Sequence, residues 1–319
     1  MGFDYKKERV NCHNDFPKRI LFETETKFEE LIDRNHGLIP FTPIKIDYND
    51  NVIFQTCIGH LIDGLDFLPF RPDHMFDNCF KVIDKAGRAQ SSSSTGIKGV
   101  VQGIGNKLLN LPNNCWGDII DLLSSNIPIS IIHYIVKRIF ESESFRLKGG
   151  KRSHGSWLAN RTECCFHPDQ YNEFIKKFAF DSNGTISLDK NNLLRATGFL
   201  TMILKGHTGS KVKDPAFPLL DLSVASNHFP QNKKCEFISS ILLYNMRNER
   251  AHGSTLSPFR SSKSTISRYE GYYYSMLCAY IISLGTFELN KFGGFSSKEV
   301  YDCCRKNINM IRDFFKIKN

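Results

Sequence analysis

Apolar residues recur at intervals of three and four along most of this 319-residue chain, which places them on one side of an α-helix. The segment from Val52 onward is an example, with a stripe formed by Phe54, Ile58, Leu61, Ile62 and Leu65. Few segments alternate with the period of two typical of strands, and we predict only a short one near 44–48. The pattern therefore predicts a mainly α protein, with a helical bundle in its C-terminal two-thirds and a smaller α-rich N-terminal region.

Capping residues, prolines and glycines indicate where several of these helices begin and end. Asp73 is predicted to cap one helix, Pro168 to open another, and Ser187 or Asp189 to cap a third. Gly253 is suited to the left-handed position that follows a helix. The predicted helices span residues 26–35, 52–65, 73–83, 118–125, 128–139, 168–178, 189–204, 235–253, 269–289 and 296–315.

A stretch rich in glycine and serine, residues 87–106, is predicted to be a loop or domain junction. We therefore divide the chain into residues 1–110, an α-rich region that senses a trigger or regulates the rest of the protein, and residues 111–319, the helical bundle.

Positive charge is concentrated in the second half of the chain. Residues 1–150 have 18 basic and 19 acidic side chains, a net of −1, whereas residues 151–319 have 24 and 14, a net of +10. This asymmetry favours a polyanionic partner, of which nucleic acid is the commonest.

The ten cysteines include no C-x-x-C pair, and a chain of this length does not need disulfides to fold. The first residues are charged rather than apolar, and the longest apolar stretch, near 276–289, is too short to span a bilayer. We expect reduced thiols in a cytoplasmic protein.

The sequence offers no complete metal site. The segment Cys164-Cys165-Phe166-His167 has no second ligand pair at the spacing that zinc needs, and the paired acidic residues of a two-metal nuclease do not recur in the basic half. We therefore expect no metal and no cofactor.

One polar segment near the end of a predicted helix combines residue types that suit ribonuclease chemistry. It contains Arg247, Asn248 and His252. A histidine can exchange a proton with the ribose 2′-OH or the leaving 5′-oxygen near neutral pH. An arginine can hold the scissile phosphate through its bidentate fork, and an asparagine can orient either group.

The spacing of these residues limits what a single copy can do. Arg247 and His252 are five positions apart, about 140° around an ideal helix, so they face different directions. Asn248 and His252 are four apart and share a face. The two reactive groups converge if the helix ends at the histidine or if a second copy supplies one of them, and we expect a homodimer with a composite active site.

The segment Arg247-Asn248-Glu249-Arg250-Ala251-His252, in a basic helical half and followed by a long apolar helix, resembles the R-N-x-x-x-H motif of the HEPN superfamily. The resemblance implies a helical bundle and a metal-independent endoribonuclease. It also implies that two motifs meet across a dimer interface and that cleavage leaves a 2′,3′-cyclic phosphate. Many such proteins are prokaryotic toxins or antiviral, abortive-infection effectors, so an antitoxin or a trigger protein is a further expected partner. The resemblance is strict over six residues and extends as a helical pattern over about 120–319.

Basic residues outside the reactive trio are predicted to contact the RNA backbone. After the motif these are Arg250, Arg260, Lys263 and Arg268, and in a basic loop before it Lys151 and Arg152. The neighbouring tyrosines 269, 272, 273 and 274 could stack on bases, but we favour a place in the core for them.

Two other functions remain open from the sequence. The first is a helical RNA-binding or interaction module without catalysis. The second is a HEPN toxin paired with a nucleotidyltransferase-type antitoxin. Cleavage of RNA in the presence of a chelator distinguishes the ribonuclease from the module and from a metal-dependent nuclease.

Overall fold

The computed structural model describes residues 4–90, 96–209, 213–253 and 257–316. It confirms the mainly α class: the described residues contain no strand, only an isolated bridge between Phe180 and Ile186. The α-helices are α1 (Tyr5–Asn14), α2 (Glu23–Arg34), α3 (Val52–Leu65), α4 (Pro72–Ala89), α5 (Gly96–Leu109), α6 (Trp116–Ser125), α7 (Ile129–Gly149), α8 (Trp157–Phe166), α9 (Pro168–Phe178), α10 (Lys190–Lys205), α11 (Gln231–Glu236), α12 (Tyr244–Ala251), α13 (Ile266–Leu289) and α14 (Ser297–Lys316).

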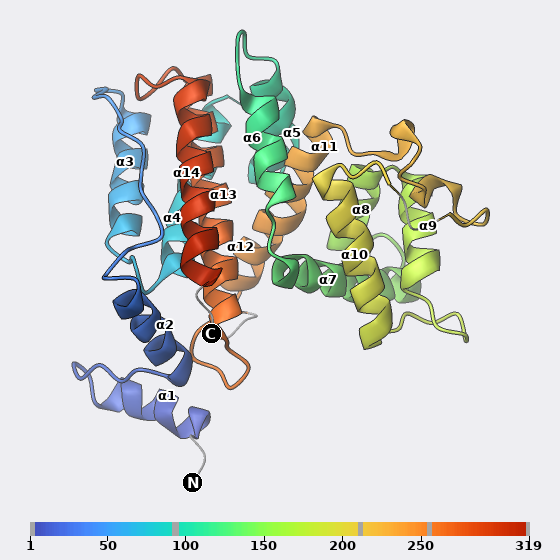
Figure 1. The fold of residues 1–319 in the computed structure, drawn as a ribbon, viewed down its shortest axis with the longest axis horizontal. Coiled ribbons are helices and arrows are strands. Elements are labelled where there is room, and N and C mark those ends of the chain that lie inside the picture. Colours follow the sequence, from blue (N-terminus) through green and yellow to red (C-terminus); the bar gives the residue numbers. More distant parts are fainter. Residues whose placement is uncertain (1–3, 91–95, 210–212, 254–256, 317–319) are drawn as a thin grey trace.

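Helix α13 forms the centre of the larger part of the molecule, where α4, α14 and the outer helix α3 run alongside it (Figure 1). Nearly every residue of α13 from Gly271 to Phe287 is buried. The Tyr269 ring stacks on Phe28 at 3.8 Å and on Phe259 at 3.9 Å between centroids. Tyr272, Tyr273 and Tyr274 are buried as well. The preference for a core role of these tyrosines is confirmed.

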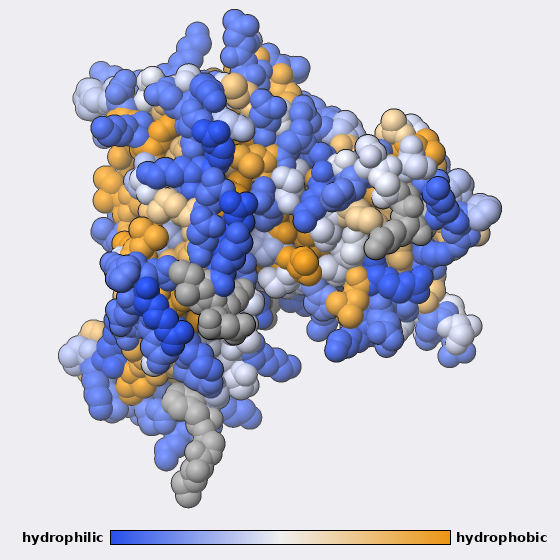
Figure 2. Space-filling model, viewed as in Figure 1, coloured by the Kyte–Doolittle hydropathy of each residue, from blue (hydrophilic) through white to orange (hydrophobic). Residues whose placement is uncertain are grey.

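A second group of helices, α8, α9 and α10, lies to one side, and α7 runs between it and the larger part (Figure 1). Its core is aromatic, with Phe140, Phe174, Phe178 and Phe199 in mutual ring contact. Figure 2 shows a largely hydrophilic surface on this face and a recess between the part around α1 and α2 and the part around α7 to α10.

The helices of residues 1–110 share their core with the rest of the chain. Helix α4 packs along α13, α5 packs against α11, and one cluster of buried apolar residues extends from Phe28 to Phe315. The expected loop at 87–106 is largely helical, because α4 continues to Ala89 and α5 begins at Gly96. Gly87 lets these two helices approach closely, since a Cβ there would lie 2.4 Å from Cγ1 of Val100. The predicted loop residues 91–95 lie outside the described residues.

The expected strand near 44–48 is also wrong. This segment pairs with no strand: the Ile44 amide donates to the Tyr280 hydroxyl of α13 at 3.0 Å, and the Asp47 amide donates to the carbonyl of Gly293, between α13 and α14, at 2.9 Å. An alternating pattern arises here because one side of the segment packs on the bundle.

Local signals at the other helix ends are mostly confirmed. Pro168 is the first residue of α9, and the Asp189 side chain accepts hydrogen bonds from the amides of Asn191 and Asn192 at the start of α10. Asp73 is not a cap, because α4 begins one residue earlier at Pro72. Within the described part of the chain no single helix is both long and apolar enough to cross a membrane, although α6 and α7, which meet at a bend of 86°, pass that test together.

Candidate functional site

Helix α12 contains Arg247 and Asn248 and is followed directly by His252; we call these three residues the reactive trio. The helix is the end of a longer helical run. The run begins with α11 and passes through a π-helical segment, η3 (Phe237–Leu243), all seven residues of which are buried. The chain becomes exposed at Ala251, the last residue of α12, and Gly253 adopts the left-handed conformation expected of it, with φ of +64°. The buried upstream part therefore fixes the position of an exposed C-terminal end that presents His252.

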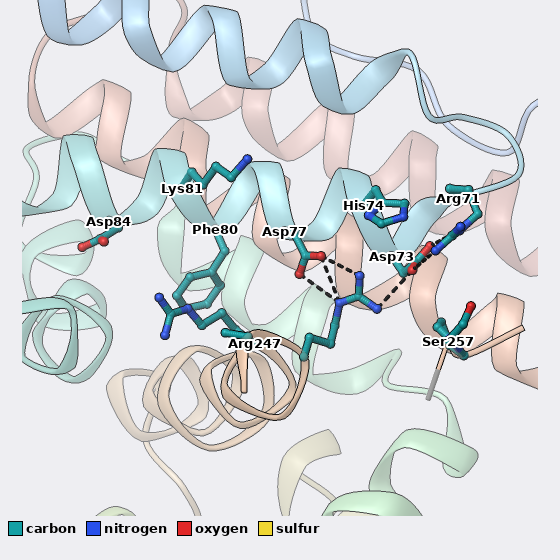
Figure 3. Close-up of a pocket in the computed structure, with 12 residues that line it drawn as sticks. Arg71, Asp73, His74, Asp77, Phe80, Lys81, Asp84, Arg247 and Ser257 are labelled. Atoms are coloured by element: carbon teal, nitrogen blue, oxygen red, sulfur yellow. Dashed lines mark hydrogen bonds and ion pairs between the residues drawn. The ribbon is translucent and has the colours of Figure 1, made fainter. Parts of the chain in front are cut away.

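Two cavities flank α12. Arg247 and Arg250 line a cavity of about 490 Å³ against α4, which we call the α4–α12 cavity (Figure 3). Asn248 and His252 line a groove of about 700 Å³ that is bordered by α7 and α8, which we call the α7–α8 groove. Arg247 and His252 thus open to different sides, as their spacing predicts, whereas Asn248 and His252 share one side.

Asn248 is a direct link between the two sides. Nη1 of Arg247 donates to Oδ1 of Asn248 at 3.1 Å, and the His252 amide donates to the Asn248 carbonyl at 3.0 Å. Figure 3 shows Arg247 beside Phe80, apart from the ion pairs of Asp73 and Asp77. Among the described residues Arg247 has no carboxylate within 4.0 Å, and His252 is exposed. Arg247 is therefore free to receive an anion, and Asn248 is placed to orient it.

Arg250 has a different environment. Its guanidinium binds both oxygens of Asp77, and Nη1 lies 3.1 Å from Oδ2 of Asp73. Asp73 is fully buried and also accepts two hydrogen bonds from Arg71, at 2.9 and 2.8 Å. Burial by itself raises the pKa of Asp73, but the hydrogen bonds and charge of Arg71 and the charge of Arg250 lower it overall. These ion pairs of Arg250, which is predicted to contact RNA, join α12 to α4.

The remaining predicted RNA contacts fall into two groups. Arg260 pairs with Glu25 at 3.0 Å and Lys151 pairs with Glu163 at 2.7 Å, so both cations have carboxylate partners. Arg152, Lys263 and Arg268 are exposed and form no ion pair within the described ranges. These last three remain available to a phosphate backbone.

A buried polar network behind α12 was missed by the sequence analysis. The Tyr134 hydroxyl donates to Glu249 at 2.7 Å and accepts from the Asn245 amide at 2.9 Å, while Arg138 pairs with Glu249 at 2.7 Å. Burial and the Glu249 carboxylate raise the pKa of Tyr134. The spacing of four between Asn245 and Glu249 could have indicated that they share a face, but their partners on α7 follow only from the fold.

No group of three or more metal-binding side chains occurs within the part of the chain that the structure describes. All ten cysteines are free thiols; Cys165 is buried and Cys164 is exposed. Comparison of the chain with protein-family models, with curated proteins and with solved structures finds no match.

Proposed function

We propose that this protein is a metal-independent endoribonuclease of the HEPN type. The observation that supports this best is the arrangement at the end of α12, where an exposed histidine, an arginine with no carboxylate partner among the described residues and a linking asparagine lie within six residues. These are the residues of the R-N-x-x-x-H motif, and each has the exposure or the freedom from ion pairs that its role requires.

The reaction needs only proton transfer and charge stabilisation. The ribose 2′-oxygen attacks the neighbouring phosphorus as an imidazole takes its proton, and the bond from phosphorus to the 5′-oxygen breaks as that oxygen receives a proton. The products are a 2′,3′-cyclic phosphate and a free 5′-hydroxyl. His252 is the proton-transfer group, Arg247 stabilises the charge that builds on the phosphate, and Asn248 orients Arg247.

The proposed enzyme is a homodimer with a composite active site. Within one chain Arg247 and His252 open to different cavities, so a single α12 does not direct both at one phosphate. A two-fold axis near the exposed end of α12 would bring the Arg247 of one copy toward the His252 of the other, which gives two equivalent sites per dimer, each with one arginine and one histidine. The proposed role, a toxin or antiviral effector in the cytoplasm that responds to an antitoxin or trigger, rests on the HEPN resemblance.

The function is tested by incubating purified protein with single-stranded RNA in the presence of EDTA. We expect cleavage with 2′,3′-cyclic phosphate ends, and a loss of about 10²–10⁴-fold in rate for His252→Ala. Arg247→Ala should cost a similar factor, and Arg247→Lys should recover little of it because an ammonium lacks the bidentate fork. Asn248→Ala should have a smaller effect. His207→Ala, an exposed histidine after α10, is the matched control and should cleave like the parent.

Undiminished cleavage by His252→Ala would show that the assignment is wrong. RNA binding by the parent without any cleavage would instead favour the alternative function of a non-catalytic RNA-binding module, for which the exposed and unpaired Lys263 and Arg268 would suffice.

A further inference from the structure

Arg161 on α8 is a buried cation that pairs with no carboxylate in the described part of the chain. Only 6% of the residue is exposed, and no described carboxylate lies within 4.0 Å of it. Its Nη1 donates to the Ser240 carbonyl at 3.0 Å, and its guanidinium lies 4.1 Å from the centroid of Tyr244. Burial lowers the pKa of Arg161. An unpaired buried charge is costly, so its presence in a structure calls for an explanation.

The π-helical segment accounts for how Arg161 is held in place. In an α-helix each carbonyl accepts from the amide four residues later, and a π segment interrupts that pairing. Ser240 lies in the middle of η3, and its carbonyl accepts from Arg161. The guanidinium is thus fixed by a backbone oxygen and an aromatic ring, neither of which neutralises its charge.

Arg161 faces the α7–α8 groove, the same groove that His252 and Asn248 line. The acidic side chains near it already have cationic partners: Glu249 pairs with Arg138 at 2.7 Å, Glu141 with Arg138 at 2.7 Å and with Lys137 at 3.8 Å, and Glu236 with Lys233 at 3.0 Å. Lys98, also on the groove, is exposed and has no ion pair within the described residues. The uncompensated charges of this groove are therefore positive.

An exposed ring lies next to this charge. Trp157 is 37% exposed, lines the same groove, and its ring centroid is 5.3 Å from the Arg161 guanidinium. A large aromatic side chain left open to solvent beside a fixed cation matches the two parts of a nucleotide, a flat base and a phosphate.

We propose that the α7–α8 groove binds one nucleotide of single-stranded RNA, with its phosphate on Arg161 and its base on Trp157. This inference rests on the proposed function, because it places that nucleotide beside the scissile phosphate at His252. Arg161 is a substrate-binding residue in this assignment. The groove would accept a single strand, since a base must leave its stack to reach Trp157.

Tryptophan fluorescence tests this without requiring cleavage. The chain has two tryptophans, and Trp116 is 1% exposed, so a ligand in the groove should act on Trp157 alone. The probe is a fully 2′-O-methylated single-stranded RNA decamer, which lacks the attacking hydroxyl. We expect it to quench the parent protein, and a duplex of the same sequence to leave the fluorescence unchanged. Free adenosine monophosphate should quench weakly and adenosine should not, which separates the phosphate from the base.

Variants assign the two contacts. Trp157→Ala should weaken decamer binding about tenfold, and Trp157→Phe should bind almost like the parent while losing the quenching. Arg161→Met should also weaken decamer binding about tenfold. It should lower the slope of log affinity against log salt concentration by about one, which corresponds to one lost phosphate contact. Because it removes an unpaired buried charge, Arg161→Met should melt no lower than the parent. Lys176→Ala, an exposed lysine on α9, is the control and should leave decamer binding unchanged.

The two proposals fail in different ways. Cleavage of unmodified RNA by a parent whose Trp157→Ala and Arg161→Met variants bind the decamer equally well would overturn the groove assignment and leave the ribonuclease standing. Quenching by the decamer without cleavage of any RNA would overturn the ribonuclease and support the groove. Loss of stability in Arg161→Met with unchanged decamer binding would assign Arg161 a purely structural role.

Discussion

Arg247 and Arg250 lie less than one turn apart on α12, yet their guanidinium groups have opposite surroundings. Arg250 is held by Asp73 and Asp77 on α4, whereas Arg247 donates to a neutral amide, that of Asn248. An arginine that already binds two carboxylates has little to offer a phosphate, because the phosphate would have to displace both. At the scale of single residues, an ion pair therefore decides which basic side chains remain available to RNA.

Arg250→Ala should act mainly by lowering the free energy of unfolding and not by removing an RNA contact. It leaves the buried Asp73 with Arg71 as its remaining partner, and breaking one side of a buried pair costs on the order of 3 kcal/mol. Urea unfolding measures the change, and Arg268→Ala, an exposed arginine, should stay within about 0.5 kcal/mol of the parent. Equal stability of the two variants would contradict the structural role of Arg250.

At the scale of elements, α12 is fixed on two sides by different interactions. The ion pairs of Arg250 join it to α4, and the network of Glu249 with Tyr134 and Arg138 joins it to α7. The attaching side chains, Glu249 and Arg250, lie between Asn248 and His252 in the sequence. The exposed end of α12 is thereby held firmly while Arg247 and His252 remain open to the two cavities.

The attachment to α4 should weaken as the pH falls. The folded-state pKa of Asp73 is below its ordinary 3.8, so its contribution is complete above that value and is lost as the pH falls through the folded pKa. Burial also lowers the pKa of the neighbouring His74 below 6.5, so the folded state resists its protonation. The stability that neutral His74 contributes is therefore lost as the pH falls from 6.5 toward its folded-state pKa.

The free energy of unfolding should therefore decline in two stages, the first below pH 6.5 and the second below pH 3.8. Urea unfolding across this range measures it. Burial lowers the pKa of His60 in the same direction, so His74→Gln should diminish the first stage without removing it. Stability that is flat from pH 7 to 5 would contradict this reading of the α4 attachment.

At the scale of the whole molecule, the N-terminal helices and the site-bearing helix belong to one packed body. Helix α4 contacts both α13 and, through its aspartates, α12. A signal received by the first hundred residues would therefore reach α12 through a shared core and a salt bridge. The proposed composite site adds a second copy to this arrangement.

Complementation between inactive variants tests the composite site. Arg247→Ala and His252→Ala should each be inactive, but co-expressed together they should regain about one quarter of the parental activity, because half of the dimers are mixed and each mixed dimer has one intact site. Sedimentation velocity of the same mixture checks that the dimers form. No recovery from a mixture shown to contain mixed dimers, or an active strict monomer, would contradict an active site shared between copies.

Features that depend on neighbours along the chain could be predicted from residue order. The helical class, the start of α9 at Pro168, a cap at either Ser187 or Asp189 and the left-handed Gly253 follow from local spacing and backbone preference. The divergence of Arg247 and His252 follows likewise from the rotation of about 100° per residue. The helical stretch around Gly87 and Gly96 was missed because glycine-rich composition indicates a loop unless a packed neighbour, such as Val100, requires the missing Cβ.

Which charges are paired and which are free depends on the fold, because the partners are distant along the chain. Arg250 and Asp77 are 173 positions apart, and Arg161 and Ser240 are 79 apart, so no local pattern connects them. The strength of an ion pair depends on distance and burial, which are properties of the folded chain rather than of residue order. For the same reason residue order grouped Arg250 with the RNA contacts and gave no sign that Arg161, in the middle of the short and largely buried α8, has no carboxylate partner among the described residues.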